Sequence, residues 1–201
     1  MLQNEYENKY WALDKLVIGT DEAGRGPICG PEVVACCVLP INYINERIND
    51  SKKLTAKKRE ELFKEIIRDA IYYDFRIVSP SEIDEYNIYA TTKMAMKELL
   101  DRYKLQSINL TDAMPISDTN VETISLIKGD AKSISIAAAS ILAKVLRDHI
   151  MDGYDHLYPE YELKKHKGYP TKRHLELIEQ YGLKDFYRMS YGPCKKILKK
   201  D

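Results

Sequence analysis

Four acidic residues stand where side chains from separate segments could meet and hold a metal ion. Asp21, Asp112 and Asp130 each come shortly after an apolar run, and Glu22 is the neighbour of Asp21. In open α/β sheets, ligands collect at the carboxyl ends of the strands. A set of carboxylate oxygens, without Cys or His at metal-binding spacing, suits Mg²⁺ or Mn²⁺ rather than zinc. These four residues are therefore candidate ligands of a divalent metal.

The chemistry of such a cluster would be phosphodiester hydrolysis. Several carboxylates cannot stay ionised side by side without a cation, because each raises the pKa of the others. Two divalent ions ~4 Å apart can activate a water on one side of a phosphodiester and stabilise the leaving oxygen on the other. The alternative is that each aspartate is a helix N-cap or a loop residue, and position alone leaves both interpretations open.

Asp21 and Glu22 are adjacent at the end of a predicted strand, which limits how both side chains could reach the same site. Successive residues of a strand point to opposite faces of the sheet. Asp21 and Glu22 can therefore share a site only if the strand breaks there, and Gly24 and Gly26 make such a break easy.

The elements that position these residues follow from apolar periodicity and from breaking and capping residues. The predicted strands are 16–19, 33–39, 71–78 and 107–111, with a weaker apolar run at 126–127. The predicted helices are 56–68 with Thr55 as N-cap, 88–103, 133–150, and a last helix that Thr171 caps and Gly182 ends. Two early strands followed by alternating helices and strands predict an α/β fold with a mixed sheet flanked by helices. We expect residues 1–150 to form the core and residues 151–201 a helical extension packed on it, as one functional unit.

Composition excludes several classes of protein. The 201 residues carry 31 basic and 31 acidic side chains, so the net charge of the protein does not favour binding to nucleic acid or to a membrane. A zero net charge still allows local patches of positive charge. No apolar stretch approaches the ~20 residues that cross a bilayer. The adjacent Cys36 and Cys37 lie in an apolar run and are typical of buried thiols in a reducing compartment, which favours a cytoplasmic protein. We expect the four histidines to be structural or surface residues, and the chain to be a monomer, because no exposed apolar stripe argues for a dimer.

Five ordered motifs extend this interpretation. They are GTDEAGRGP at 19–27, DSKKL at 50–54, DA at 112–113, GDAKS at 129–133 followed by AAASILAKV at 137–145, and HKGYPT at 166–171. From about residue 15 to 194 the chain resembles ribonuclease HII, the type 2 ribonuclease H of bacteria. Departures are modest: Glu32 stands where an apolar residue is more usual, and the segment 191–194 is a loose version of the family ending.

The resemblance implies a ribonuclease H-like fold and an endoribonuclease that hydrolyses the RNA strand of RNA/DNA hybrids. It also implies incision of duplex DNA on the 5′ side of an embedded ribonucleotide, leaving 3′-hydroxyl and 5′-phosphate ends, as in DNA replication and ribonucleotide excision repair. By motif, Asp21, Glu22, Asp112 and Asp130 become the catalytic ligands of two Mg²⁺ or Mn²⁺ ions, with Asp21 bridging both.

The resemblance also implies residues that bind the nucleic acid. The turn Gly24-Arg25-Gly26 would present backbone groups to the ribonucleotide, whose 2′-hydroxyl distinguishes RNA from DNA. Tyr169 would lie at the RNA–DNA junction. The alternative is a structural role, because the chain has fifteen tyrosines and a tyrosine before a proline more often packs within a loop. Lys52 and Lys53 would contact phosphates, in a stretch (52–68) with seven basic and three acidic residues.

Two other functions remain open. A nucleic-acid-binding module that had lost catalysis would lack one of the acidic ligands, and none is missing. A phosphohydrolase acting on a small nucleotide would favour a phosphate-cradling loop of the type G-x-x-x-x-G-K-S/T, which the sequence lacks.

Overall fold

The centre of the protein is a five-stranded mixed sheet, as predicted. The computed structural model describes residues 4–49, 51–103, 107–117, 119 and 121–199. The strands are β1 (Leu16–Ala23), β2 (Glu32–Val38), β3 (Tyr72–Val78), β4 (Ser107–Asp112) and β5 (Thr123–Leu126), in the order β3-β2-β1-β4-β5. β1 runs antiparallel to β2 and parallel to β4, while β5 continues the parallel part beside β4.

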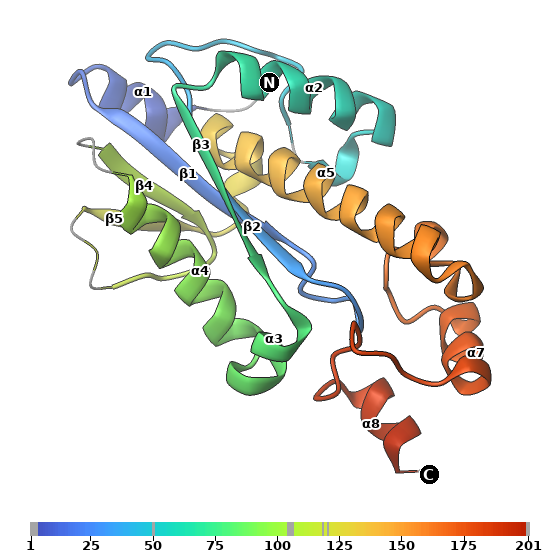
Figure 1. The fold of residues 1–201 in the computed structure, drawn as a ribbon. Helices are drawn as coiled ribbons and strands as arrows, with labels where there is room; N and C mark the ends of the chain where they lie inside the picture. Colours follow the sequence, from blue (N-terminus) through green and yellow to red (C-terminus); the bar gives the residue numbers. More distant parts are fainter. Residues whose placement is uncertain (1–3, 50, 104–106, 118, 120, 200–201) are drawn as a thin grey trace.

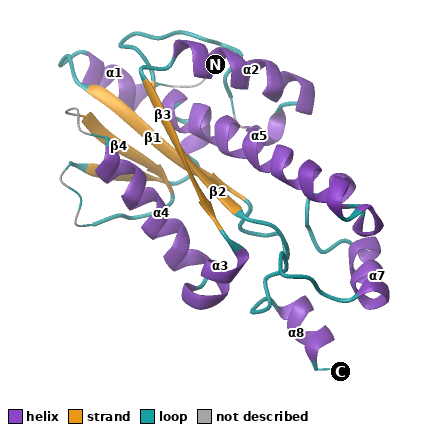
Figure 2. Cartoon of the chain, viewed as in Figure 1, coloured by secondary structure: helices purple, strands orange, loops and turns teal. Residues whose placement is uncertain are grey.

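Helices cover both faces of this sheet (Figures 1 and 2). In chain order, the helices of the described residues are α1 (Glu5–Trp11), α2 (Ala56–Asp69), α3 (Pro80–Tyr86), α4 (Ile88–Arg102), α5 (Ile134–Leu157), α6 (Leu163–His166), α7 (Lys172–Tyr181) and α8 (Gly192–Leu198), with short 3-10 helices η1 (Ser51–Lys53), η2 (Gly129–Ala131) and η3 (Pro159–Tyr161). One apolar cluster joins α1, α2 and α5 to the sheet, and a second joins α3 and α4 to its other face.

Alternation along the central strands explains the near-continuous apolar runs in the sequence. Cys37 belongs to the cluster on the α5 side and Cys36 to the cluster on the α4 side. The two adjacent thiols therefore point to opposite faces of β2. Cys36 and Cys37 are buried and free, as expected, and so are Cys29 and Cys194. Burial raises the pKa of Cys36 to about 12.

Helix α5 lies closest to the strand that carries the first acidic pair. A Cβ placed on Gly19 would lie 2.2 Å from the carbonyl carbon of Ser135, so only glycine allows the helix backbone to approach β1 this closely. Ser133 caps the helix by accepting the backbone N–H of Ile136 at 3.1 Å. The apolar circumference of α5 is thus explained by its central position.

The last part of the chain has its own apolar cluster. Tyr161, Phe186 and Tyr187 pack there with Ile28 and Cys29, which follow β1. Residue 150 lies inside α5, so the predicted division at 150/151 falls within a continuous helix. Thr171 and Gly182 bound α7 as predicted.

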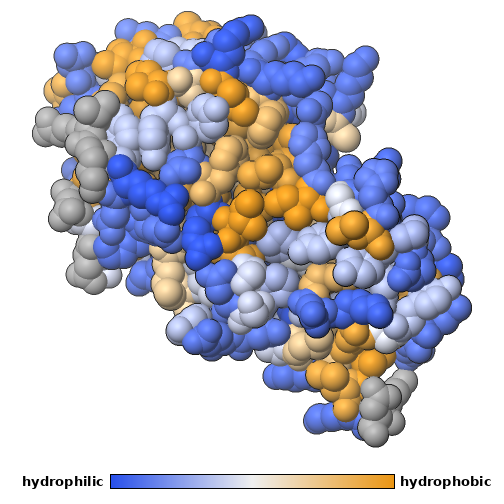
Figure 3. Space-filling view, in the orientation of Figure 1, coloured by the Kyte–Doolittle hydropathy of each residue, from blue (hydrophilic) through white to orange (hydrophobic). Residues whose placement is uncertain are grey.

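The face seen in Figure 3 is mostly polar, with apolar side chains gathered in a band across its middle. Exposed apolar residues of β3 include Tyr73 and Ile77.

Within the described part of the chain, no helix has both the length and the apolar character needed to span a membrane.

Candidate active site

The parallel part of the sheet brings the predicted acidic ligands to one edge. Thr20 of β1 is paired with Thr111 of β4, so Asp21 and Asp112 are the next residues on neighbouring strands. Asp112 is itself paired with Leu126, the last residue of β5. Asp130 lies in η2, directly after β5, and is buried. All four carboxylates thus belong to the carboxyl-terminal edge formed by β1, β4 and β5.

Nearby backbone amides orient two of these carboxylates. The N–H of Glu22 donates to Oδ1 of Asp21 at 2.8 Å, and the N–H of Gly129 donates to Oδ1 of Asp112 at 2.7 Å. Among the described residues, no group of three or more Asp, Glu, His or Cys side chains is arranged to hold a metal ion as they stand. The four predicted ligands share an edge of the sheet without forming a closed cage.

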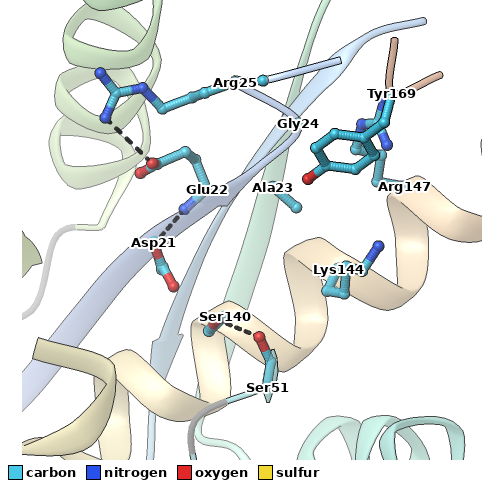
Figure 4. Close-up of a pocket in the computed structure, with 11 residues that line it drawn as sticks. Asp21, Glu22, Ala23, Gly24, Arg25, Ser51, Ser140, Lys144, Arg147 and Tyr169 are labelled. Carbon is cyan, nitrogen blue, oxygen red and sulfur yellow. Dashed lines mark hydrogen bonds and ion pairs between the residues drawn. The ribbon is translucent and has the colours of Figure 1, made fainter. Parts of the chain in front are cut away.

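The strand does not break between Asp21 and Glu22, although alternation along a strand made such a break the condition for the two side chains to share a site. β1 continues to Ala23, and pairing with β2 persists through Glu22 and Ala23. The two side chains accordingly leave the strand in different directions in Figure 4. Glu22 is directed toward Arg25, whose Nη1 lies 3.5 Å from Oε1 of Glu22, and both acidic residues still line one pocket.

The electrostatics of Asp21 fit a cation site. Burial raises the pKa of the Asp21 carboxyl well above its usual range, and the neighbouring carboxylates of Glu22 and Asp112 raise it further, against a smaller opposing effect of a hydrogen bond with Ser140. A divalent cation would reverse this effect, because it favours the ionised form of each carboxylate. The all-oxygen donor set is also the one that Mg²⁺ and Mn²⁺ prefer.

A pocket of about 230 Å³ lies beside the acidic pair (Figure 4). The residues that line it are Asp21, Glu22, Ala23, Gly24, Arg25, Gly26, Ser51, Ser140, Lys144, Arg147 and Tyr169. Asp112 and Asp130 are not among the described residues that line it. The pocket therefore joins the acidic pair to the predicted turn and to the predicted tyrosine.

The turn and Tyr169 line the same pocket, although Gly26 and Tyr169 lie 143 positions apart in the sequence. A Cβ on Gly26 would lie 3.3 Å from Cε1 of Tyr169, so the ring lies directly over this glycine. Gly24 has a φ of +107°, and a Cβ there would lie 2.3 Å from Nε of Arg147. Gly24 is thus required by close approach and by its backbone conformation, whereas a Cβ at Gly26 would only need the Tyr169 ring to shift slightly. Tyr169 is 46% exposed, so its ring is accessible to a ligand.

The two predicted phosphate-binding lysines lie next to the pocket in sequence. Ser51, their neighbour, lines it, and its hydroxyl lies 2.9 Å from that of Ser140. Lys53 is exposed, whereas the side chain of Lys52 lies outside the described part of the structure.

Sequence reasoning did not single out three lining residues of α5. Ser140, Lys144 and Arg147 recur at helical spacing on a helix that is otherwise mostly apolar, and that interruption was an available signal. Nζ of Lys144 lies 2.7 Å from Oδ1 of Asp148. Lys144 and Arg147 therefore bring positive charge to the pocket that contains the acidic pair.

The fold and the acidic edge are those of ribonuclease H-like, metal-dependent nucleases. The structure of ribonuclease H2 from Pyrococcus horikoshii OT3 is similar over 92% of this chain and 98% of that chain, with a TM-score of 0.80 and 28% identity.

The sequence comparisons are more specific. The ribonuclease HII family model matches residues 18–194. Ribonuclease HII of Clostridioides difficile (strain 630) is 48% identical over 190 residues, which cover 94% of this chain and 74% of that protein. Ribonuclease HII of Mycoplasma mycoides is 47% identical over 183 residues, covering 90% and 88%. The chain belongs to the ribonuclease HII family, whose members are metal-dependent endoribonucleases acting on RNA/DNA hybrids.

Proposed function

We propose that this protein incises duplex DNA on the 5′ side of an embedded ribonucleotide, as well as the RNA strand of hybrids, and leaves 3′-hydroxyl and 5′-phosphate ends. The observation that carries the proposal is Asp21, a buried carboxyl beside Glu22 and Asp112 in a pocket that also contains the glycine turn and Tyr169. Acidic ligands next to a ribonucleotide-sized surface are what such a reaction requires.

Asp21, Glu22, Asp112 and Asp130 would hold two Mg²⁺ or Mn²⁺ ions. When bound, such ions polarise the phosphate and lower the pKa of a water molecule. Asp21 is the residue that would contact both ions, which is supported by the carboxylates of Glu22 and Asp112, both close enough to raise its pKa. At Asp21 and at Asp112, a hydrogen bond from a backbone N–H binds one carboxylate oxygen and thereby orients the other.

The turn Gly24-Arg25-Gly26 and Tyr169 would recognise the ribonucleotide. Gly24 and Gly26 line the pocket without side chains, so their backbone groups could contact a sugar and its 2′-hydroxyl, and the exposed Tyr169 ring offers a surface for stacking. Lys52, Lys53 and Lys144 would contact phosphates on the surrounding rim.

The remaining assignments concern the organisation of the chain. Residues 151–201 would act as an extension that packs on the core, which is supported by the cluster that joins Tyr161 and Phe186 to Ile28. The protein would act as a monomer, and light scattering at working concentration tests this directly.

Cleavage of a labelled DNA duplex with one ribonucleotide tests the function, against all-DNA and all-RNA duplexes. Wild type, Asp21→Asn and Asp112→Asn are compared with Mg²⁺, with Mn²⁺ and with chelator. Asp69→Asn is a matched control, because Asp69 lies on α2 and pairs with Arg68. We expect metal-dependent incision 5′ to the ribonucleotide by wild type and Asp69→Asn, and a loss of more than about 100-fold in the two site variants, beyond the range for residues that only support a metal ligand.

Two outcomes would contradict the proposal. Binding without incision under every metal would favour a non-catalytic nucleic-acid-binding protein. Hydrolysis of free nucleotides with no incision of duplexes would favour a small-molecule phosphohydrolase.

A further inference from the structure

Two buried arginines donate hydrogen bonds to the backbone of the loop that follows β1. Arg147 of α5 and Arg188 of the C-terminal part are 1% and 0% exposed. Arg147 donates to the carbonyls of Pro31 (3.0 Å) and Cys29 (3.3 Å), while Arg188 donates twice to the carbonyl of Gly30, at 3.1 and 3.0 Å. The loop 25–31 is therefore held through its backbone by side chains from distant segments.

One of these contacts reaches the turn itself. The carbonyl oxygen of Arg25 accepts the hydroxyl of Tyr191 at 2.9 Å and Nη1 of Arg188 at 3.2 Å. Nη1 of Arg188 also donates to the Tyr191 hydroxyl at 3.1 Å, and the guanidinium lies 5.2 Å from the centre of the tyrosine ring. The middle residue of the turn is thus fixed by a closed triangle of hydrogen bonds.

Such a triangle restricts the peptide plane between Arg25 and Gly26. Glycine neighbours leave that plane free to rotate, because no Cβ limits their φ and ψ. Charged donors make stronger bonds than neutral ones, and a rigid guanidinium fork loses little freedom when it binds carbonyls. The C-terminal residues thus supply the order that the glycines lack.

We propose that Arg188 and Tyr191 are positioning residues for ribonucleotide recognition, acting through the Arg25 carbonyl. This inference rests on the proposed role of the turn in contacting the ribonucleotide. Neither residue lines the pocket, so neither is expected to contact substrate. Their function is to hold the backbone groups of the turn in the orientation that reads the 2′-hydroxyl.

Tyr191→Phe tests the proposal with little change of shape, since it removes the hydroxyl and keeps the ring. Tyr161→Phe is the matched control: the Tyr161 hydroxyl donates to the carbonyls of Tyr181 and Gly182, away from the turn. KM and kcat are measured on a duplex with one ribonucleotide, together with inhibition by an all-DNA duplex and the melting temperature of each variant.

We expect Tyr191→Phe to raise KM about 5-fold, the equivalent of one hydrogen bond, and to leave kcat and inhibition by all-DNA duplex unchanged. Tyr161→Phe lowers the melting temperature and leaves KM unchanged. A purely structural role would move the melting temperature in both variants and KM in neither, which would overturn the proposal. Arg188→Lys, which keeps the charge and loses the fork, is expected to raise KM further when circular dichroism shows it folded.

The outcomes separate this inference from the function on which it rests. If wild type does not incise the ribonucleotide duplex, the proposed function fails before any variant is compared. If wild type incises and Tyr191→Phe has the wild-type KM, only the positioning role is lost.

Discussion

The backbone N–H of Gly129 donates to Oδ1 of Asp112 at 2.7 Å, and this bond ties the turn that carries Asp130 to the end of β4. Gly129 sits tightly there, since a Cβ would lie 2.6 Å from Cδ1 of Ile136. One proposed ligand therefore orients the segment that presents another. The spacing between the carboxylates depends on backbone contacts as much as on the side chains themselves.

Asp21→Asn should stabilise the protein in the presence of chelator. Because the folded-state pKa of Asp21 is raised, its contribution to stability is fully present below the unfolded pKa of 3.8 and is lost as pH rises through the folded pKa. The asparagine variant does not titrate, so its melting temperature should exceed that of wild type near neutral pH and converge with it toward pH ~4. Added Mn²⁺ should raise the melting temperature of wild type more than that of the variant. A variant less stable than wild type at every pH would contradict the burial argument.

Gly19→Ala should destabilise the fold by about 1–3 kcal/mol, the usual range for overpacking, because its Cβ would meet the backbone of Ser135 and Ile136. Incision should fall as well, since the strand that carries Asp21 must move away from α5. Gly153→Ala, in α5, is the control: its Cβ would meet nothing within 4 Å, and the variant should be more stable by about 0.5–1 kcal/mol. Urea unfolding measures both, and equal effects would refute the packing argument.

Glu32→Gln should remove a loss of stability that wild type shows as pH rises. Glu32 is fully buried in β2 and accepts the Thr92 hydroxyl at 2.7 Å, and burial raises its pKa to about 7. The protonated Glu32 side chain contributes about 3 kcal/mol to the free energy of unfolding. This contribution is fully present below the unfolded pKa of 4.5 and is lost as pH rises through about 7. Unfolding free energies across this window should fall less in the variant. Parallel curves for the two proteins would show that Glu32 ionises normally.

His174 should have the opposite pH dependence. It is buried, donates from Nδ1 to the carbonyl of Tyr169 at 2.9 Å and accepts the Tyr187 hydroxyl at Nε2, also at 2.9 Å. Burial lowers its pKa from 6.5 to about 4, so stability is present above the unfolded pKa and falls by about 3 kcal/mol as pH drops from 6.5 to about 4. NMR titration of the imidazole signal checks this directly. An ordinary midpoint near 6.5 would contradict it, and His174→Gln should flatten the acid limb of the stability curve.

The sequence by itself determined the elements and the class of chemistry. Thr55 and Thr171 cap helices where local spacing places them, because an N-cap needs only a hydroxyl and an amide three residues later. The acidic residues at strand ends were equally visible, since strand ends follow from apolar runs and breaking residues. The resemblance to the family then indicated the kind of reaction and predicted which residues are the metal ligands.

Tertiary structure decided how those residues are held. Gly24 and Gly26 would have made a strand break near Asp21 easy, yet pairing with β2 carries the strand to Ala23, because hydrogen bonds to a neighbouring strand override the flexibility of later glycines. The contact of Tyr169 with Gly26 and the grip of Arg188 on Gly30 join residues more than a hundred positions apart. No local signal encodes such contacts, since they depend on how the helices and the C-terminal part pack against the sheet.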